Sequence, residues 1–188
     1  MQRIEIDVAR AQMLFDPLVG LTLSPNSYFV LDTLCLVFES LGNGVSGVDF
    51  SPGGRPDYIL EAGCQWVVAD ENSRIVFESW MATSSHSDSA ARSAQKVFTG
   101  SEFLHPVLLG YGPEIGPTNQ QLGQIIVESV EVKMAGQVSL RLNSRRTICL
   151  MDNVDGDGEW LLYRAGKVVC TYFAGKGLFE RVRALPSL

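Results

Sequence analysis

Residues 152–160, DNVDGDGEW, hold a dense group of potential metal ligands. A calcium loop of the EF-hand type needs oxygen ligands at its positions 1, 3 and 5, Gly at 6 and a bidentate Glu at 12. Counting from Asn153 puts Asp155 and Asp157 at positions 3 and 5, but Arg164 falls on position 12. Because a cation stands where the strongest anionic ligand belongs, the stretch predicts a turn, a role that Asp and Gly favour, and no calcium site.

The same turn is expected to present several carboxylates at the surface. Crowded carboxylates can meet Lys or Arg side chains of a protein partner. A solvated turn without a function is the simpler alternative interpretation. The candidate partner-binding residues are Asp152, Asp155, Asp157 and Glu159.

Other residue types that could support catalysis do not form a usable set. Ser84, His86 and Asp88 are the types of a hydrolase triad, but neighbours in sequence cannot adopt its geometry. The second histidine, His105, precedes a proline and is expected to be extended. The Gly-rich runs LGNGVSG and SPGGRPD lack the phosphate-binding pattern. We therefore predict no catalytic, metal-binding or cofactor-binding residues, and no cofactor.

Composition narrows the class of protein. The 188 residues are 46% hydrophobic and 19% charged, which is typical of a globular chain. A net charge of −6 argues against nucleic acid as a partner. The four cysteines show neither C-x-x-C spacing nor a zinc pattern, and no run reaches the length of a membrane span. We expect a cytoplasmic protein that contacts no membrane.

The first part of the chain predicts several strands joined by a long loop. Residues 31–40, LDTLCLVFES, are apolar at successive positions, which predicts a strand buried on both faces or nearly so. Residues 41–57 are rich in Gly, Ser and Pro and predict a loop. Gln65–Ala69 and Arg74–Glu78 are β-rich runs separated by DENS, which predicts a hairpin.

The second part repeats this order. Residues 122–134 begin with an apolar run, residues 137–144 alternate apolar and polar side chains, and residues 159–172 predict a hairpin around Gly166. The offsets between equivalent residues are 103, 104, 94 and 93, so they differ mainly by one change in loop length. We infer an internal duplication. The equivalent pairs are Gly20 with Gly123, Leu36 with Leu140, Trp66 with Trp160, and Ile75 with Val168.

The predicted fold is therefore α+β and β-dominated, with two similar antiparallel-sheet halves joined by a loop and short-helix connector. The first half covers residues 1–80, the connector 81–121 and the second half 122–188, within one compact unit. Ser89–Phe98 is the candidate connector helix, and a further short helix is possible around Ile4 to Leu14. The two tryptophans that match are expected to be core anchors, one per half.

The repeated pattern, L-G-x-x-[IL] followed by L-x-L-x-[FL] and W-[VL]-[VL], resembles that of small bacterial immunity proteins. These belong to contact-dependent inhibition and other polymorphic toxin systems. The resemblance covers about two thirds of the chain and involves core positions, so it carries over no functional residue. The residues that carry it are Leu18, Gly20, Leu34, Leu36, Phe38 and Trp66, and again Leu122, Gly123, Leu140, Leu142 and Trp160.

The resemblance implies a non-enzymatic cytoplasmic inhibitor that binds a cognate toxin domain and blocks its active site. The acidic composition agrees with this expectation, because a basic toxin would be attracted to an acidic inhibitor. The alternative is a small-molecule-binding or housekeeping domain with a pocket between the two halves, lined by the Gly-rich loops and the connector.

Overall fold

The computed structural model describes residues 2–25, 27–30, 33–40, 56–78, 98–99, 104–109, 124–151 and 158–182. β-strands dominate this part of the chain, with two α-helices and two 3-10 helices. The strands are β1 Gln2–Ile6, β2 Thr22–Leu23, β3 Tyr28–Val30, β4 Thr33–Glu39, β5 Tyr58–Gly63, β6 Gln65–Ala69, β7 Ile75–Glu78, β8 Phe98–Thr99, β9 Ile125–Val132, β10 Val138–Leu142, β11 Thr147–Met151, β12 Glu159–Arg164, β13 Lys167–Phe173 and β14 Gly177–Val182. The helices are α1 Val8–Phe15, η1 Asp16–Leu18, α3 Leu104–Leu108 and η2 Met134–Gly136.

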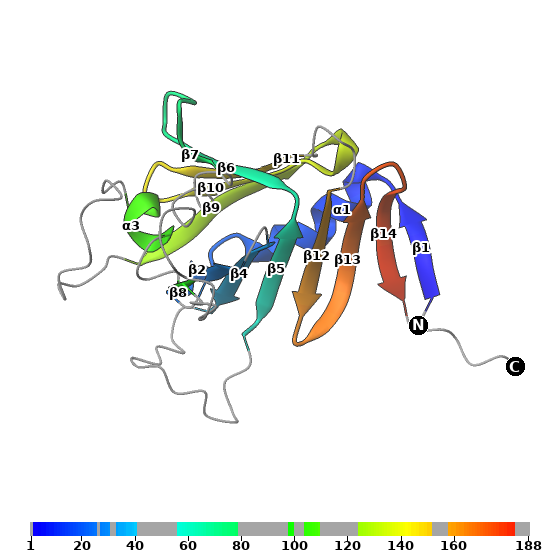
Figure 1. The fold of residues 1–188 in the computed structure, drawn as a ribbon. Helices are drawn as coiled ribbons and strands as arrows, with labels where there is room; N and C mark the ends of the chain where they lie inside the picture. Colours follow the sequence, from blue (N-terminus) through cyan, green and yellow to red (C-terminus); the bar gives the residue numbers. More distant parts are fainter. Residues whose placement is uncertain are drawn as a thin grey trace, which may run out of the picture.

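All fourteen described strands belong to one antiparallel sheet. Its main path runs β1-β14-β13-β12-β5-β4-β2-β9-β10-β11-β6-β7, and β3 and β8 extend it beside β4. The sheet folds into two layers, with β6, β7, β9, β10 and β11 above the layer formed by β4, β5, β12, β13, β14 and β1 (Figure 1). Only Cys64 lies between β5 and β6, and there the chain passes from one layer to the other.

The strands on the two sides of the β2–β9 pair can be matched one to one. On one side follow β4, β5, β12 and β13, and on the other follow β10, β11, β6 and β7. In this matching β4 corresponds to β10, β5 to β11, β12 to β6 and β13 to β7. Hydrogen-bonding registers repeat as well: Trp160 lies opposite Ala62, and Trp66 lies opposite Leu150. The register shifts between Leu162 and Tyr163 in one hairpin and between Val68 and Ala69 in the other. Thus the sheet does not divide into one sheet per half. Each part of the chain instead contributes its hairpin to strands of the other.

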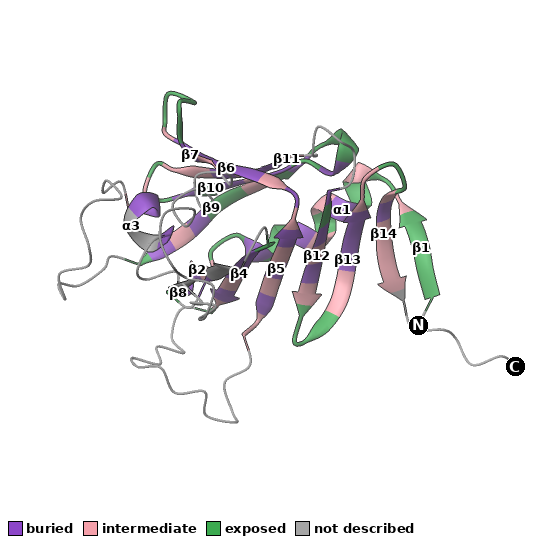
Figure 2. Ribbon diagram, in the orientation of Figure 1, coloured by how far each residue is buried: buried purple, intermediate pink, exposed green. Residues whose placement is uncertain are grey.

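Buried side chains from both layers form one core (Figure 2). Trp66 and Trp160 are each 1% exposed, as expected for core anchors. Helix α1 packs on β9, β13 and β14, and the rings of Phe15 and Trp160 form a T-shaped pair with 5.1 Å between their centroids. No helix in the described part of the chain is long and apolar enough to cross a membrane.

Most strands lie where the alternation of side chains predicted them. Strand β4 buries Leu34, Cys35, Leu36 and Phe38, so a strand covered on nearly both faces is confirmed. The predicted hairpins correspond to β6–β7 and β12–β13. Gly166 turns the second hairpin with φ +74°, a left-handed conformation that glycine adopts without strain.

Several elements differ from the sequence prediction. Strands β1, β3, β5, β8 and β14 were not predicted, and β5 occupies a central place in the sheet. Phe98, the last residue of the predicted connector helix, lies in β8 instead. Helix α1 begins at Val8, and Asp7 is its N-cap. The Asp7 carboxylate accepts a hydrogen bond of 2.7 Å from the Arg10 backbone amide. His105 is helical rather than extended. Pro106 falls in the first turn of α3, where a backbone N–H would have no acceptor within the helix, so the missing N–H of proline costs no hydrogen bond.

Other sequence predictions fall outside the described residues. These are most of the Gly-rich loop 41–57, the triad-like residues Ser84, His86 and Asp88, nearly all of the connector helix Ser89–Phe98, and Gly123. Of the equivalent residues Gly20 and Gly123, the structure therefore describes only Gly20, which has φ +86°.

Candidate protein-binding face

The lower layer has an outer face, which points away from the core, and this face carries apolar and aromatic side chains. Strands alternate their side chains between faces, so the residues next to the buried Trp160 and Leu162 point outward. We define the outer face by its partly or fully exposed residues. They are Val37, Ile59, Glu61, Glu159, Leu161, Tyr163, Phe173 and Phe179, with Arg3, Glu5 and Arg181 toward its β1 end.

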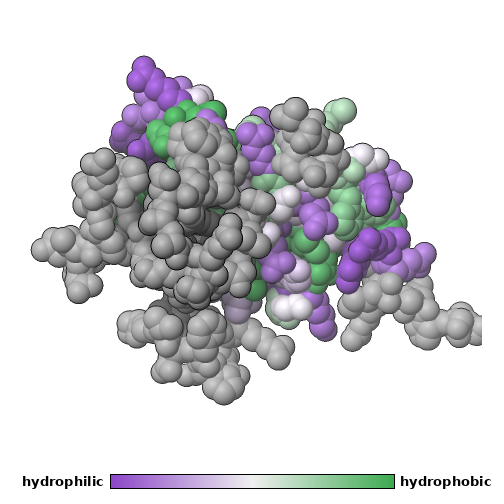
Figure 3. Space-filling model, in the orientation of Figure 1, coloured by the Kyte–Doolittle hydropathy of each residue, from purple (hydrophilic) through white to green (hydrophobic). Residues whose placement is uncertain are grey.

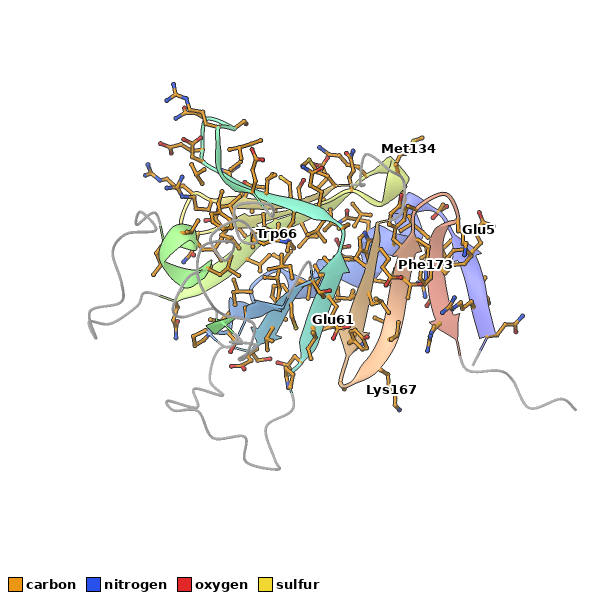
Figure 4. All side chains as sticks on the ribbon, in the orientation of Figure 1. Glu5, Glu61, Trp66, Met134, Lys167 and Phe173 are labelled. Atoms are coloured by element: carbon orange, nitrogen blue, oxygen red, sulfur yellow. The ribbon has the colours of Figure 1, made fainter. Side chains whose placement is uncertain are left out.

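Figure 3 looks onto this face. Hydrophobic residues lie over β12 and β13, and hydrophilic residues border them over β14 and β1. Glu61 and Phe173 both project from the strands that form it (Figure 4). A partly exposed apolar centre with a charged border is typical of protein-binding surfaces, in which Tyr, Phe and Arg are enriched.

Tyr163 and Glu61 form a fixed pair at the centre of the face. The Tyr163 hydroxyl donates a hydrogen bond of 2.8 Å to the Glu61 carboxylate across the β12–β5 ladder. Partial burial, together with the hydrogen bond to Glu61 and the Glu61 charge, raises the pKa of Tyr163 to about 12. At neutral pH the phenol therefore stays protonated and keeps donating. The pair presents a rigid, partly apolar surface of the kind that costs little conformational entropy on binding.

Aromatic rings continue the face toward β14 and β1. The centroids of Phe173 and Phe179 lie 6.3 Å apart, and the Arg3 guanidinium lies 5.0 Å from the Phe173 ring centre. Thr171 lies opposite Leu161 and Phe179 in the ladders and is completely buried. Its hydroxyl has no hydrogen-bond partner in the described part of the chain. The ring–ring and cation–ring contacts hold the aromatic side chains of this face in place.

The structure describes one of the four carboxylates proposed for partner binding. Glu159 is exposed on the outer face, where it lies opposite Phe173 in one ladder and Gly63 in the other. Asp152, Asp155 and Asp157 lie outside the described residues, so the prediction of a calcium-free turn stays a prediction. Among the described residues, no three His, Cys, Asp or Glu side chains are grouped so as to hold a metal ion.

Sequence reasoning missed the aromatic face, although a signal was present. In EWLLYR, Leu161 and Tyr163 alternate with Trp160 and Leu162, so both faces of the strand are apolar. That pattern is typical of a strand buried on both sides. The alternative, an apolar face left half-exposed, can be distinguished only when the neighbouring layer is known.

A hollow lies between turns from the two parts of the chain. A hollow of about 280 Å³ separates the β6–β7 turn from the β10–β11 turn. Glu71 and Arg145 form an ion pair of 3.3 Å across it, and the shielded Ser144 hydroxyl has no partner among the described residues. The sequence predicted a pocket between the halves that is lined by the Gly-rich loops and the connector. The hollow in the structure is lined instead by the polar β6–β7 and β10–β11 turns. The lining residues are Asp70, Glu71, Asn72, Ser144, Arg145 and Arg146.

The Asp70 side chain is already occupied by its own turn. Its carboxylate accepts hydrogen bonds of 2.9 Å from the Asn72 and Arg74 amides, and the Arg74 bond is the main cause of the lowered pKa of Asp70. The charges of Arg74 and Arg146 lower that pKa further. Asp70 thus stabilises the turn as an ordinary capping carboxylate.

The chain matches no known protein family, no curated protein and no solved structure.

Proposed function

We propose that the protein is a non-catalytic binding protein, an immunity protein that neutralises a cognate toxin domain in the cytoplasm. The observation that carries this proposal is the outer face, where Leu161, Tyr163 and Phe173 are partly exposed within a charged border. An apolar, aromatic surface of this kind loses water when a protein partner covers it, and that loss favours binding.

Charge supports the same proposal. The whole chain carries a net charge of −6, which would attract a basic toxin domain and speed its encounter. On the outer face, Glu61 and Glu159 flank Leu161, while Glu5 lies toward the β1 end. We propose that Glu159, together with Asp152, Asp155 and Asp157 just before it in the sequence, contributes to the contact with basic residues of the toxin.

We also propose that the fold arose by internal duplication. Support comes from the matching strand order about the β2–β9 pair and from the equivalent positions of Trp66 and Trp160 in their ladders. The matching register shifts at Val68 and Leu162 agree with the offset of 94 between the tryptophans. Strands β14 and β1 have no counterpart beyond β7 in this arrangement, within the described part of the chain.

The decisive experiment is co-expression with a toxin domain encoded by a gene adjacent to the one for this chain. We expect growth to be rescued and a complex to elute as one peak in gel filtration, with the toxin's activity lost in the complex. Growth that is not rescued, together with the absence of a complex, would reject the immunity function.

Substitutions then locate the contact. Tyr163→Ala and Phe173→Ala are each expected to weaken toxin binding at least tenfold, because truncating a central aromatic residue of an interface typically costs about 2 kcal/mol or more. Val76→Ala serves as the control, since Val76 is 39% exposed but lies in the other layer. Isothermal titration calorimetry measures the affinities. Unchanged affinity in both aromatic variants would place the contact elsewhere.

The alternative function, small-molecule binding, is favoured by the hollow between the β6–β7 and β10–β11 turns. Its two arginines, two carboxylates and shielded Ser144 hydroxyl suit a small polar ligand that carries charge. A thermal-shift screen of anionic metabolites, repeated with Arg146→Ala, tests this. A shift that persists in the variant would show that the ligand binds outside the hollow.

A further inference from the structure

Strand β1 forms one end of the sheet. Gln2–Ile6 pairs with β14, and no other described strand lies beside it. Figure 2 shows β1 exposed along almost its whole length, and Ile4 is 44% exposed. The free edge of such a strand carries unpaired backbone N–H and C=O groups, which are a template for a further strand.

Two copies of β1 can pair with each other only in a few registers. In an antiparallel pair, residues that lie opposite each other share one face of the sheet. Consider two identical strands related by a two-fold axis perpendicular to the sheet. One residue of the strand must then lie opposite the same residue of the second copy, and the axis passes between these two residues. The register centred on Ile4 pairs all five residues: Gln2 with Ile6, Arg3 with Glu5, and Ile4 with Ile4 of the second copy.

The charges of β1 select this register. Centred on Ile4, each Arg3 lies opposite Glu5 of the second copy, so two pairs of opposite charge form on the outer face. Centred on Arg3 or on Glu5, the pairing places like charges directly opposite each other, which destabilises a sheet. These two registers also pair fewer residues. Charges on an edge strand usually prevent association, but this spacing of opposite charges makes the strand complementary to itself.

We propose that two copies of the protein associate through their β1 strands, antiparallel and centred on Ile4, to form a two-fold symmetric dimer with a continuous sheet. The interface is of the isologous kind, in which the same patch is used by both copies. Because the axis passes through the sheet, the outer faces of the two copies lie on the same side and adjoin each other. The proposal stands independently of the immunity function.

The Arg3 side chain already has a role within one copy, since its guanidinium lies over the Phe173 ring. Glu5, in contrast, forms no hydrogen bond or ion pair within the described residues. Glu5 is therefore the cleaner residue to substitute. A variant at Glu5 changes the proposed contact without removing a contact inside the subunit.

Sedimentation velocity over a wide concentration series tests the dimer. We expect the wild-type protein to shift reversibly from monomer to dimer as its concentration rises, because two five-residue strands bury less area than a stable dimer needs. Glu5→Arg places Arg3 opposite an arginine and is expected to remain monomeric. The control Glu159→Arg makes the same charge change on β12, away from this edge, and should dimerise like the wild type.

Mixing variants tests the register itself. Arg3→Glu alone is expected to be monomeric, because it places Glu5 opposite a glutamate. An equimolar mixture of Arg3→Glu and Glu5→Arg should form a heterodimer, since each acidic position then faces a basic one. Circular dichroism confirms that each variant is folded. A wild-type protein that stays monomeric at its highest concentration, a Glu5→Arg variant that dimerises, or a mixture that stays monomeric would each overturn the proposal.

Discussion

At the scale of single residues, the packing around Trp160 illustrates how local geometry stabilises the core. The indole N–H donates a hydrogen bond of 2.6 Å to the Gly136 carbonyl, and the ring stacks on Tyr172 at 5.9 Å between centroids. Gly136 itself has φ +67° and lies against the face of the Tyr172 ring. A buried indole needs such an acceptor, because an unpaired N–H in the core is costly.

Gly136→Ala is the prediction at this scale. A Cβ atom on Gly136 would lie 2.3 Å from the Tyr172 ring, so the ring or the backbone must move. We expect a loss of more than about 2 kcal/mol in the free energy of unfolding, measured by urea denaturation.

The control is Gly166→Ala. Gly166 also has a positive φ, +74°, but a Cβ atom there meets nothing within 4 Å. This variant should lose only about 1–2 kcal/mol, the cost of the left-handed backbone. Equal losses in the two variants would show that the close approach to Tyr172 contributes nothing.

At the scale of elements, one ion pair joins the helix to a late strand. Arg10 on α1 donates two hydrogen bonds, of 2.7 Å and 2.6 Å, to the Glu180 carboxylate on β14. The Arg10 hydrogen bond and charge lower the pKa of Glu180 despite partial burial. Residues far apart in the sequence thus fix the position of α1 over the sheet, on the side where the sheet extends through β14 to β1.

The lowered pKa of Glu180 makes part of the stability pH-dependent. A carboxyl group whose pKa is lower in the folded than in the unfolded state stabilises the protein at pH values above its unfolded-state pKa, here 4.5. This contribution is lost as the pH falls through the folded-state pKa. Glu180→Gln is therefore expected to lower Tm by a few degrees at pH 7. The difference from the wild type should shrink as the pH falls below 4.5. Thermal unfolding followed by circular dichroism measures both.

Glu159→Gln is the matched control for this titration. Glu159 is exposed and forms no hydrogen bond or ion pair within the described part of the chain. Its substitution should leave Tm nearly unchanged at every pH. A Glu180→Gln variant whose Tm differs from the wild type equally at pH 3 and at pH 7 would contradict a role for the ionised carboxylate.

At the scale of the whole molecule, the two parts of the chain depend on each other. Strand β5 needs β12 as its neighbour, and β6 needs β11. Each part alone would leave these inner edges and the buried faces of Trp66 and Trp160 exposed to water. Because these ladders join the two parts, we expect the sheet to unfold as one cooperative unit.

Fragments test this dependence. We expect residues 1–121 and residues 122–188 to be unfolded when produced separately, and to regain strand structure when mixed. Circular dichroism and tryptophan fluorescence follow the change, because Trp66 and Trp160 become buried only in the assembled sheet. A fragment that folds cooperatively by itself would show that the exchanged hairpins are not needed for stability.

Sequence patterns identified the elements whose signal is local. The two-residue period of β10, with Val138, Leu140 and Leu142 buried, is visible without any knowledge of neighbours. Strand β5 was missed because Glu61, Ala62 and Gly63 have weak strand preference and follow a Gly-rich loop. Pairing with β4 and β12 on its two edges overrides that preference.

The sequence by itself therefore determined the positions of most strands and the two tryptophan anchors, because alternation and turn residues act over a few neighbouring positions. Only the tertiary structure decided which strands lie side by side. Backbone hydrogen bonds between strands are nearly independent of side-chain type, so the exchange of hairpins and the half-exposed outer face follow from packing of the whole chain. The free edge of β1 has the same origin.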